Sequence, residues 1–494
     1  MLLGKFYEGM ELHRENKIVY ARFTSPHAVL STSRANGGYR EDLLYLFNHQ
    51  ACEPSGHGGG KAMQGYTDPD SYLESVCAQH GIGPASRCAS LSTAANMRLC
   101  DVRAESYKDL TVVAAVTAGV EGNAGRAGDP ASGYEGRNGY EAIPRWKKAL
   151  EEAHKLPSRR EGAKGQGQGD AGAGDARRAG GAETARDAGY AEQAEGAEGA
   201  EGAENAEGPH DLKGARDTNG VPGSKAAPKG GDAAGPDAGS PGSGDAGGLP
   251  PHGTINTLLF VNLPVTPGCL ARLIMTATEA KTAALQELNV NSRYSEGLAT
   301  GTGTDQIAVA SLFVDGFPPL SSAGKHSKLG ELTGRLVKAA TKEALLRQNS
   351  LTPELQCSVK ILVDRLFERE GIFRTTREEL AEMFSADMDP ETAELFLCNS
   401  KAAFCDPATA AGVAAMMHLR DQFSWGTFPL LLWPEIMSAQ AALLGAAASG
   451  DFSKAEGYRK RLEKLSEDRS REGFVRLLGA ALAMGYSDKW EKGV

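Results

Sequence analysis

The chain of 494 residues is poor in aromatic side chains, in basic charge and in uninterrupted apolar runs. Phe, Trp and Tyr make up only 6% of the residues, which is low for a chain of this length that packs uniformly. The 53 Lys and Arg side chains against 63 Asp and Glu leave a net charge of −10, so no basic surface indicates nucleic-acid binding. The most apolar late stretch, residues 428–448, is interrupted by Pro429, Pro434, Glu435 and Gln440, and we expect no membrane insertion.

The eight cysteines lack the spacing of a disulfide framework, and the start of the chain lacks the apolar core of a secretion signal. We therefore expect a cytoplasmic protein with reduced thiols. The HExxH, paired CxxC and GxSxG patterns are also missing from the blocks that we expect to be ordered. His49, Cys52 and His57 stand close together, but zinc sites usually have four ligands, so the sequence predicts no metal site.

Apolar side chains are scarcest between residues 161 and 250. This stretch holds 24 of the 61 glycines and carries 8 basic against 16 acidic side chains, a net −8 of the total −10. It cannot bury enough apolar surface to offset the entropy lost on ordering. We predict a disordered, acidic, Gly/Ala-rich insert at 157–252, which leaves the rest of the chain close to neutral.

Strand and helix patterns alternate on both sides of this insert. Buried strands are predicted at 17–23, 28–33 and 110–117 before it, and at 254–262 and 306–311 after it; helices are predicted at 144–154, 268–288 and 329–347. Neither side has enough predicted strands to form a stable sheet of its own. We therefore predict one α/β (α+β layered) domain with a mixed sheet, built from 1–156 and 253–350 and interrupted by the insert.

The last block, 351–494, has apolar residues at three- and four-residue spacing with charged opposite faces. This pattern predicts a C-terminal helical region, with helices at 358–370, 376–384 and 451–465 among others. It holds one histidine, His418, and no cluster of metal-ligating or catalytic side chains. The sequence assigns no function to this region.

Polar, glycine-rich segments follow several of the predicted strands. They are Asn-Gly-Gly at 36–38, TAGVEGNAGRAGD at 117–129, ATGTGTD at 299–305 and GKHSKLGE at 324–331, with TATEAKTAAL at 276–285 on a helix. Turns after successive strands of an α/β sheet are common ligand sites, and glycine lets backbone amides approach a ligand. Each segment alone is equally typical of a turn or a helix cap. Together they predict a small-molecule site.

Six segments stand in one order along the first two blocks. They are VLSTSRANGG with FNHQ, then TAGVEGNAGRAGD, GTINTLLFVN, TATEAKTAAL, ATGTGTD and GKHSKLGELTG. In that order they resemble the adenosylcobinamide amidohydrolase (CbiZ) family. The resemblance covers about 1–350 without the insert, and the C-terminal region lies outside it.

The resemblance implies hydrolysis of the amide that joins aminopropanol to the corrin ring of adenosylcobinamide. The products would be adenosylcobyric acid and 1-amino-2-propanol, in corrinoid salvage. The cobalt belongs to the small-molecule corrinoid substrate, so no resident cofactor is implied. Two alternatives stay open: a non-catalytic corrinoid-binding carrier or sensor, and an interaction protein with a vestigial amidohydrolase domain. Exposed apolar helix faces in the C-terminal region would suit a homo-oligomer as well as a packed satellite domain.

Amide hydrolysis requires an activated nucleophile, donors for the oxyanion and a proton for the departing amine. His326 is a candidate acid or base because histidine titrates near neutrality, and Glu279 is a competing base. Asp305 is a candidate to orient either, and Lys281 to donate to the oxyanion. The candidates for substrate binding are Asn36, Gly37, Gly38, Asn123, Thr300, Gly301, Thr302, Gly303 and Thr304. A covalent route through Thr302 or Thr304 also stays open.

Overall fold

The computed structural model describes residues 1–51, 68–120, 122–131, 133–137, 139–142, 253–369, 372–373, 383, 391 and 401–491. All of these belong to one unit of the chain, formed by Met1–Pro157 together with Gly247–Val494. The predicted insert at 157–252, the predicted helix at 144–154 and all of the predicted helix at 376–384 except Met383 lie outside the described residues.

The larger of two main sheets takes strands from both sides of the insert. Its order is β5 (Gly38–Arg40), β4 (His27–Ser31), β15 (Gln306–Leu312), β13 (Ile255–Val261), β9 (Leu110–Ala118) and β8 (Asp101–Tyr107). β13 and β15 are parallel, and the other pairs are antiparallel. The predicted mixed sheet, with β13 and β15 inserted between β4 and β9, is therefore confirmed.

The smaller sheet is formed by the N-terminal part of the chain. Its order is β1 (Leu2–Tyr7), β2 (Met10–Glu15), β3 (Ile18–Phe23), β6 (Tyr45–Gln50) and β7 (Cys88–Thr93), with β6 and β7 parallel. One apolar core lies between the two sheets: Leu12, Leu46 and Leu91 from the smaller sheet pack with Phe260 and Ala310 from the larger one. These five side chains are almost fully buried, so the sheets are stacked face to face.

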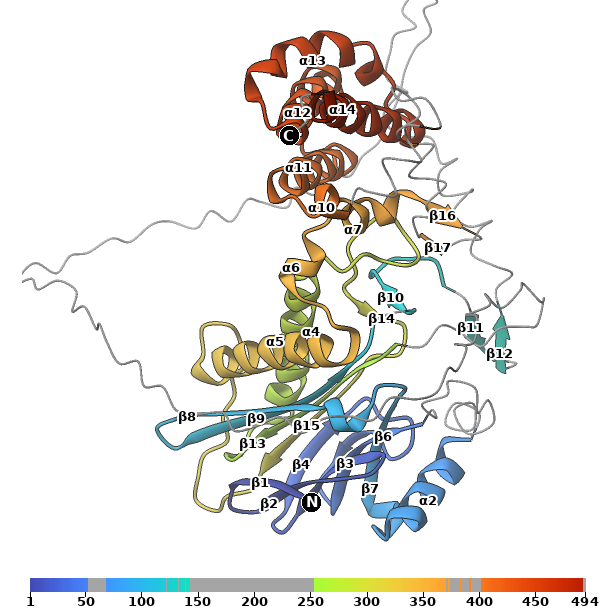
Figure 1. The fold of residues 1–494 in the computed structure, drawn as a ribbon. Helices are drawn as coiled ribbons and strands as arrows, with labels where there is room; N and C mark the ends of the chain where they lie inside the picture. The colour runs from blue at the N-terminus through green and yellow to red at the C-terminus, as the bar shows by residue number, and fades with distance from the viewer. Residues whose placement is uncertain are drawn as a thin grey trace, which may run out of the picture. The chain divides into compact units, whose positions relative to one another are not determined.

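Helices cover the outer faces of both sheets (Figure 1). α4 (Pro267–Glu287) and α5 (Lys328–Asn349) pack on the larger sheet, and α2 (Pro69–His80) packs on the smaller sheet. Each begins at a side-chain cap, in which Thr266, Ser327 and Asp68 accept a hydrogen bond from a backbone N–H in the first turn. The domain is therefore a layered helix–sheet–sheet–helix arrangement.

Strand direction brings the polar turns to one edge of the larger sheet. Ala118 at the end of β9 pairs with Ile255 at the start of β13, and Ser31 at the end of β4 pairs with Ala308 near the start of β15. In the smaller sheet, the parallel strands β6 and β7 end at the same place. This is shown by the hydrogen bond from the Ser92 N–H, near the end of β7, to the Gln306 side chain at the start of β15, at 2.9 Å. We call this place, where β4, β6, β7 and β9 end and β13 and β15 begin, the site edge.

The C-terminal region is mainly helical in its described parts. Its helices are α6 (Pro353–Gln356), α7 (Val359–Val363), α10 (Lys401–Phe404), α11 (Pro407–Ser424), α12 (Trp433–Ser449), α13 (Ala455–Leu462) and α14 (Arg471–Glu491). Val413, Met437, Leu444, Phe474 and Leu478 are buried together in a core of their own. The prediction of a C-terminal helical region is thus confirmed.

The predicted helix at 358–370 is wrong beyond residue 363. After α7 the chain makes one 3₁₀ turn, and Glu368–Arg369 (β16) pairs with Ile372–Phe373 (β17). The Arg365 side chain explains the break because it is turned inward, 4% exposed, and donates to both carboxylate oxygens of Asp421 and to the Glu296 carbonyl. A charged group buried in this way requires those partners, and satisfying them overrides the apolar spacing.

One stretch among the described residues is long and apolar enough to cross a membrane by composition. It is Leu430–Ser449, with a mean hydropathy of 1.3, and half of it is buried. α12 makes up most of it and buries Met437, Ala441 and Leu444 in the core of the C-terminal region. Its apolar composition is that of a core helix.

Buried His27 makes the stability of the fold depend on pH. Its Nδ1 contacts the Ser25 carbonyl at 2.8 Å, its Nε2 contacts the Tyr7 hydroxyl at 3.1 Å, and burial lowers its pKa from 6.5 to about 4. Between those pH values the unfolded chain binds the extra proton, so stability falls as pH falls. We expect the wild type to lose about 2 kcal/mol more than His27→Gln between pH 7.5 and 5. Urea unfolding of both proteins at both pH values measures this, and equal losses would contradict it.

Candidate active site

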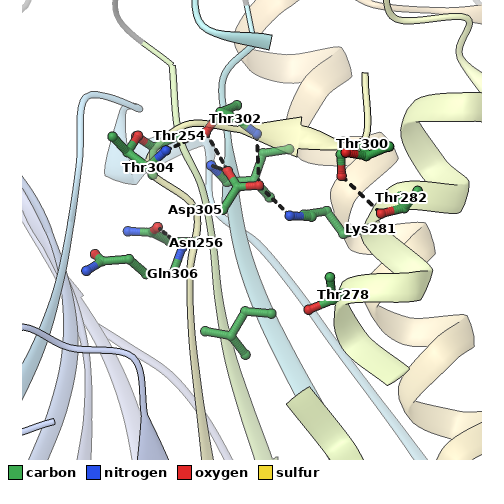
Figure 2. A network of polar contacts seen from close by, with 12 residues as sticks. Thr254, Asn256, Thr278, Lys281, Thr282, Thr300, Thr302, Thr304, Asp305 and Gln306 are labelled. Carbon is green, nitrogen blue, oxygen red and sulfur yellow. Dashed lines mark hydrogen bonds and ion pairs between the residues drawn. The ribbon is translucent and has the colours of Figure 1, made fainter. Parts of the chain in front are cut away.

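A buried ion pair lies at the site edge, between α4 and the turn that enters β15. Lys281 Nζ contacts Asp305 Oδ2, and the two side chains are 8% and 12% exposed (Figure 2). Asp305 also accepts hydrogen bonds from the Ile255 N–H, the Thr302 N–H and the Thr302 hydroxyl, at 2.9, 2.9 and 2.5 Å. Its carboxylate therefore holds the turn 301–305 against both α4 and β13.

Glycine at 301 makes this close packing possible. A Cβ atom on Gly301 would lie 2.8 Å from Lys281 Nζ, closer than side chains pack. Gly301–Thr302 (β14) pairs with Ala124–Gly125 (β10), so the 117–129 segment is joined directly to the 299–305 turn. Two of the polar segments singled out in the sequence thus form one structure.

A second layer of hydrogen bonds anchors this turn to the start of β13. The Thr304 and Thr254 hydroxyls are 2.5 Å apart, so one donates to the other, and both lie within hydrogen-bond distance of the Gly253 carbonyl. Asn123 Nδ2 donates to the same carbonyl at 3.0 Å, while Asn123 Oδ1 accepts from the Tyr294 hydroxyl. Thr304 and Asn123, both candidates for substrate binding, are therefore engaged in holding the loops together.

Buried amide side chains link the two sheets directly below the site edge. Asn256 donates to Asn48 Oδ1 at 2.9 Å and to the Ser92 carbonyl at 3.0 Å, and Asn48 donates to the Thr117 hydroxyl at 2.7 Å. The Gln306 N–H completes the network by donating to Asn256 Oδ1. These side chains are not among the site residues predicted from the sequence. One feature of the sequence could have indicated Asn256: it is an amide side chain within the apolar strand TINTLLFVN. A buried amide in such a strand requires hydrogen-bond partners.

A cavity of about 210 Å³ opens at the site edge. It is lined by Thr32, Arg34, Ala35, Pro69, Tyr72, Ser90, Ser92, Gly303, Thr304, Asp305 and Gln306. In the part of the chain that the structure describes, the backbone N–H groups of Gly303 and Asp305 have no hydrogen-bond acceptor. Residues from both sheets, α2 and the 299–305 turn thus form a polar cavity with spare donors in its wall.

His49 and Tyr72 form a hydrogen-bonded pair at the wall of this cavity. His49 lies on β6 and is 6% exposed, and its Nδ1 is 2.6 Å from the hydroxyl of Tyr72 on α2. Tyr72 lines the cavity. In the sequence, His49 stands out only as a possible metal ligand, and its partner Tyr72 is 23 residues away along the chain. Cys52 and His57 lie outside the described residues, within which no three His, Cys, Asp or Glu side chains gather.

The predicted acid and base candidates, His326 and Glu279, lie away from the cavity wall. Glu279 is on α4, 44% exposed, and forms a surface ion pair with Lys325 at 3.0 Å. His326 is exposed in the turn before α5. Glu279 and Lys281 face different directions, as their two-residue spacing on a helix requires.

Two other predicted binding segments also have structural partners. Asn36 has a left-handed backbone (φ 53°) and donates both side-chain N–H groups, to the Ala85 and Cys88 carbonyls. Gly37 and Gly38 complete that turn, with Gly38 at φ 77°. The Thr300 hydroxyl accepts from the Ala127 N–H at 2.9 Å. The structure thus brings Lys281, Asp305 and 301–304 together and leaves Asn36 and Thr300 as supports of neighbouring loops.

The fold and this edge define a layered α/β protein with a polar small-molecule cavity where its strands end. The adenosylcobinamide amidohydrolase family model matches residues 3–154 and 217–353. This is more than half of the chain, which belongs to the CbiZ family. An uncharacterized protein of Methanocaldococcus jannaschii is 45% identical over 100 residues, and the match spans 20% of this chain and 38% of that relative.

Proposed function

We propose that the protein hydrolyses adenosylcobinamide to adenosylcobyric acid and 1-amino-2-propanol, as part of corrinoid salvage. Membership of the amidohydrolase family supports the reaction. The observation that carries the proposal is the polar cavity at the site edge, whose wall offers unpaired backbone donors at Gly303 and Asp305. Its volume of about 210 Å³ suits the side-chain amide of a corrinoid rather than the whole ring, which would lie across the mouth.

The turn 301–305 is suited to stabilise the oxyanion of the tetrahedral intermediate. Fixed backbone N–H groups are effective oxyanion donors because they need no rearrangement during the reaction. The Lys281–Asp305 pair and the Thr302 contacts fix the backbone on which the Gly303 and Asp305 amides are carried. In this proposal Lys281 and Asp305 are positioning residues, and Arg34 at the cavity wall is a further donor.

The proton transfers are assigned to the His49–Tyr72 pair. Tyr72 reaches the cavity, and the 2.6 Å contact to His49 lets the imidazole take or return a proton through the tyrosine hydroxyl. His326 and Glu279 remain the competing prediction from the sequence. Their exposure at the surface is compatible with catalysis only where the bound corrinoid covers them.

We propose further that residues 1–156 and 253–350 form the catalytic domain, with 157–252 as an insert that the reaction does not need. The C-terminal region, 351–494, is then an accessory part. The protein is proposed to act in the cytoplasm on a corrinoid substrate, and the apolar side chains exposed on the C-terminal region, such as Leu431 at 88%, suit a homo-oligomer.

Incubation of the full chain with adenosylcobinamide tests the reaction. We expect a corrinoid that has lost aminopropanol and gained a carboxylate, together with free 1-amino-2-propanol, both seen by chromatography and mass spectrometry. Heat-unfolded protein is the control for spontaneous hydrolysis. Corrinoid that binds but stays unchanged would indicate a carrier or sensor instead, and folded protein that neither binds nor cleaves it would refute the proposal.

A further inference from the structure

A second cavity, of about 240 Å³, lies apart from the residues of the catalytic proposal. It is lined by Arg126, Glu296, Gly297, Arg420, Asp421, Phe423, Ser424, Trp425, Leu430, Trp433 and Arg469. Three arginines and three aromatic rings therefore surround one small space. This composition is unlike that of the cavity at the site edge, whose lining has one arginine and one aromatic ring.

The charges of this second cavity do not cancel. Arg420 forms an ion pair with Glu296. Arg365, which is not part of the lining, forms a bidentate ion pair with Asp421 at 2.7 and 3.1 Å. Both acidic groups of the lining are thereby neutralised. Within the described residues, Arg126 and Arg469 have no carboxylate partner, so the cavity presents uncompensated positive charge.

The indole of Trp433 is buried in the wall of this cavity. Trp433 is 4% exposed, and its Nε1–H has no hydrogen-bond acceptor in the part of the chain that the structure describes. A buried indole N–H normally has one, because leaving it unpaired costs about 1–3 kcal/mol. The indole nitrogen has almost no accessible surface, so the contacts to a ligand are assigned to the arginines of the lining.

Trp425 supplies a flat surface beside these donors. Its ring is 54% exposed although it lines the cavity, and the Arg126 guanidinium lies 5.9 Å from its centre. Arg126 also lies against Gly297, where a side chain would collide with it. An exposed indole next to a cation is a typical surface for stacking a planar ring.

We propose that this cavity binds a nucleoside monophosphate. Its base stacks on Trp425, and its phosphate accepts hydrogen bonds from Arg126 and Arg469. The cavity is smaller than the roughly 300–1,000 Å³ usual for larger ligands, which favours a mononucleotide over a dinucleotide. The site gives the C-terminal region a ligand-binding role, and the inference does not rest on the amidohydrolase activity.

Titration of the full chain with AMP, followed by calorimetry and tryptophan fluorescence, tests this inference. We expect saturable binding that Arg126→Gln weakens at least about tenfold, since it removes a charged donor. Gly297→Ala keeps the arginine but takes its space, so we expect a smaller loss. Arg459→Gln, an exposed arginine on α13 that is not in the lining, is the matched control and should bind like the wild type.

Two fragments of AMP, adenosine and inorganic phosphate, test the stacking surface and the phosphate contacts separately. Adenosine lacks the anion and inorganic phosphate lacks the ring, so each should bind at least about tenfold more weakly than AMP. No saturable binding of AMP would overturn the inference. Equal binding by Arg126→Gln, Trp425→Ala and wild type, all shown to be folded, would overturn it as well, because AMP would then occupy another place.

Discussion

Lys281→Met is expected to lower the free energy of unfolding by about 3–5 kcal/mol and to abolish most of the amidohydrolase activity. The substitution keeps the length of the side chain but leaves the Asp305 carboxylate, 12% exposed, without its cation. Its remaining partners are two backbone N–H groups and one hydroxyl, which do not neutralise a buried charge. The 301–305 turn would shift, and with it the donors of Gly303 and Asp305. Urea unfolding and turnover of adenosylcobinamide measure the two effects.

Lys325→Gln is the matched control for the stability of this pair. It removes a lysine from an exposed ion pair made by α4, the pair with Glu279, in which the Lys325 and Glu279 side chains are 66% and 44% exposed. An exposed pair contributes about 1 kcal/mol or less, so this variant should unfold close to the wild type. The double variant Lys281→Met/Asp305→Asn should be less unstable than Lys281→Met alone, since it removes the unpaired charge. A Lys281→Met protein as stable as Lys325→Gln would contradict the assignment.

His49→Ala is expected to lower kcat about 100-fold or more while adenosylcobinamide still binds. The imidazole is the group that accepts the proton through Tyr72 in the proposed mechanism, and the substrate is held by other parts of the cavity wall. Tyr72→Phe breaks the same relay with the loss of one oxygen, so its kcat should fall in parallel. Initial rates over a range of adenosylcobinamide concentrations measure kcat and KM for both variants.

His418→Gln is the control for the loss of a histidine, since His418 is exposed on α11 outside the catalytic proposal. The competing assignment is tested with His326→Ala and Glu279→Ala in the same assay. If one of these loses 100-fold in kcat while folded His49→Ala stays within about threefold of the wild type, the acid–base chemistry belongs to the exposed pair of α4 and the turn before α5.

Local pattern predicted the four central strands of the larger sheet and the two helices on it, but of the smaller sheet only β3, and not the helix α2. The apolar runs of β9, β13 and β15 mark buried strands, and the three- and four-residue spacing of apolar side chains in 268–288 and 329–347 agrees with α4 and α5 within two residues. The shortage of strands on each side of the insert also predicted one shared sheet. The domain boundaries themselves remain predictions.

The polar segments of the site were visible in the sequence, but their partners were not. Lys281 and Asp305 could be singled out in the sequence as polar members of TATEAKTAAL and ATGTGTD. Their contact arises because α4 packs on the larger sheet with Lys281 beside the turn that enters β15. The Asn48–Asn256 contact joins residues 208 apart, and the His49–Tyr72 contact joins a strand to a helix on the outer face of the smaller sheet. No periodicity encodes such pairs.

Sequence by itself therefore determined the main elements of the larger sheet, the family and the acidic composition of the insert, because these depend on composition, on spacing along the chain and on the order of motifs. Only the tertiary structure decided that Asp305 holds the 301–305 turn in place and that Asn36 donates both side-chain N–H groups to the Ala85 and Cys88 carbonyls. It also decided that the helix ends just before Arg365, whose side chain pairs with Asp421. The physical reason is the same in each case. A buried polar group must find its partner in space, and the partner comes from whichever segment the packing of the sheets and helices brings near.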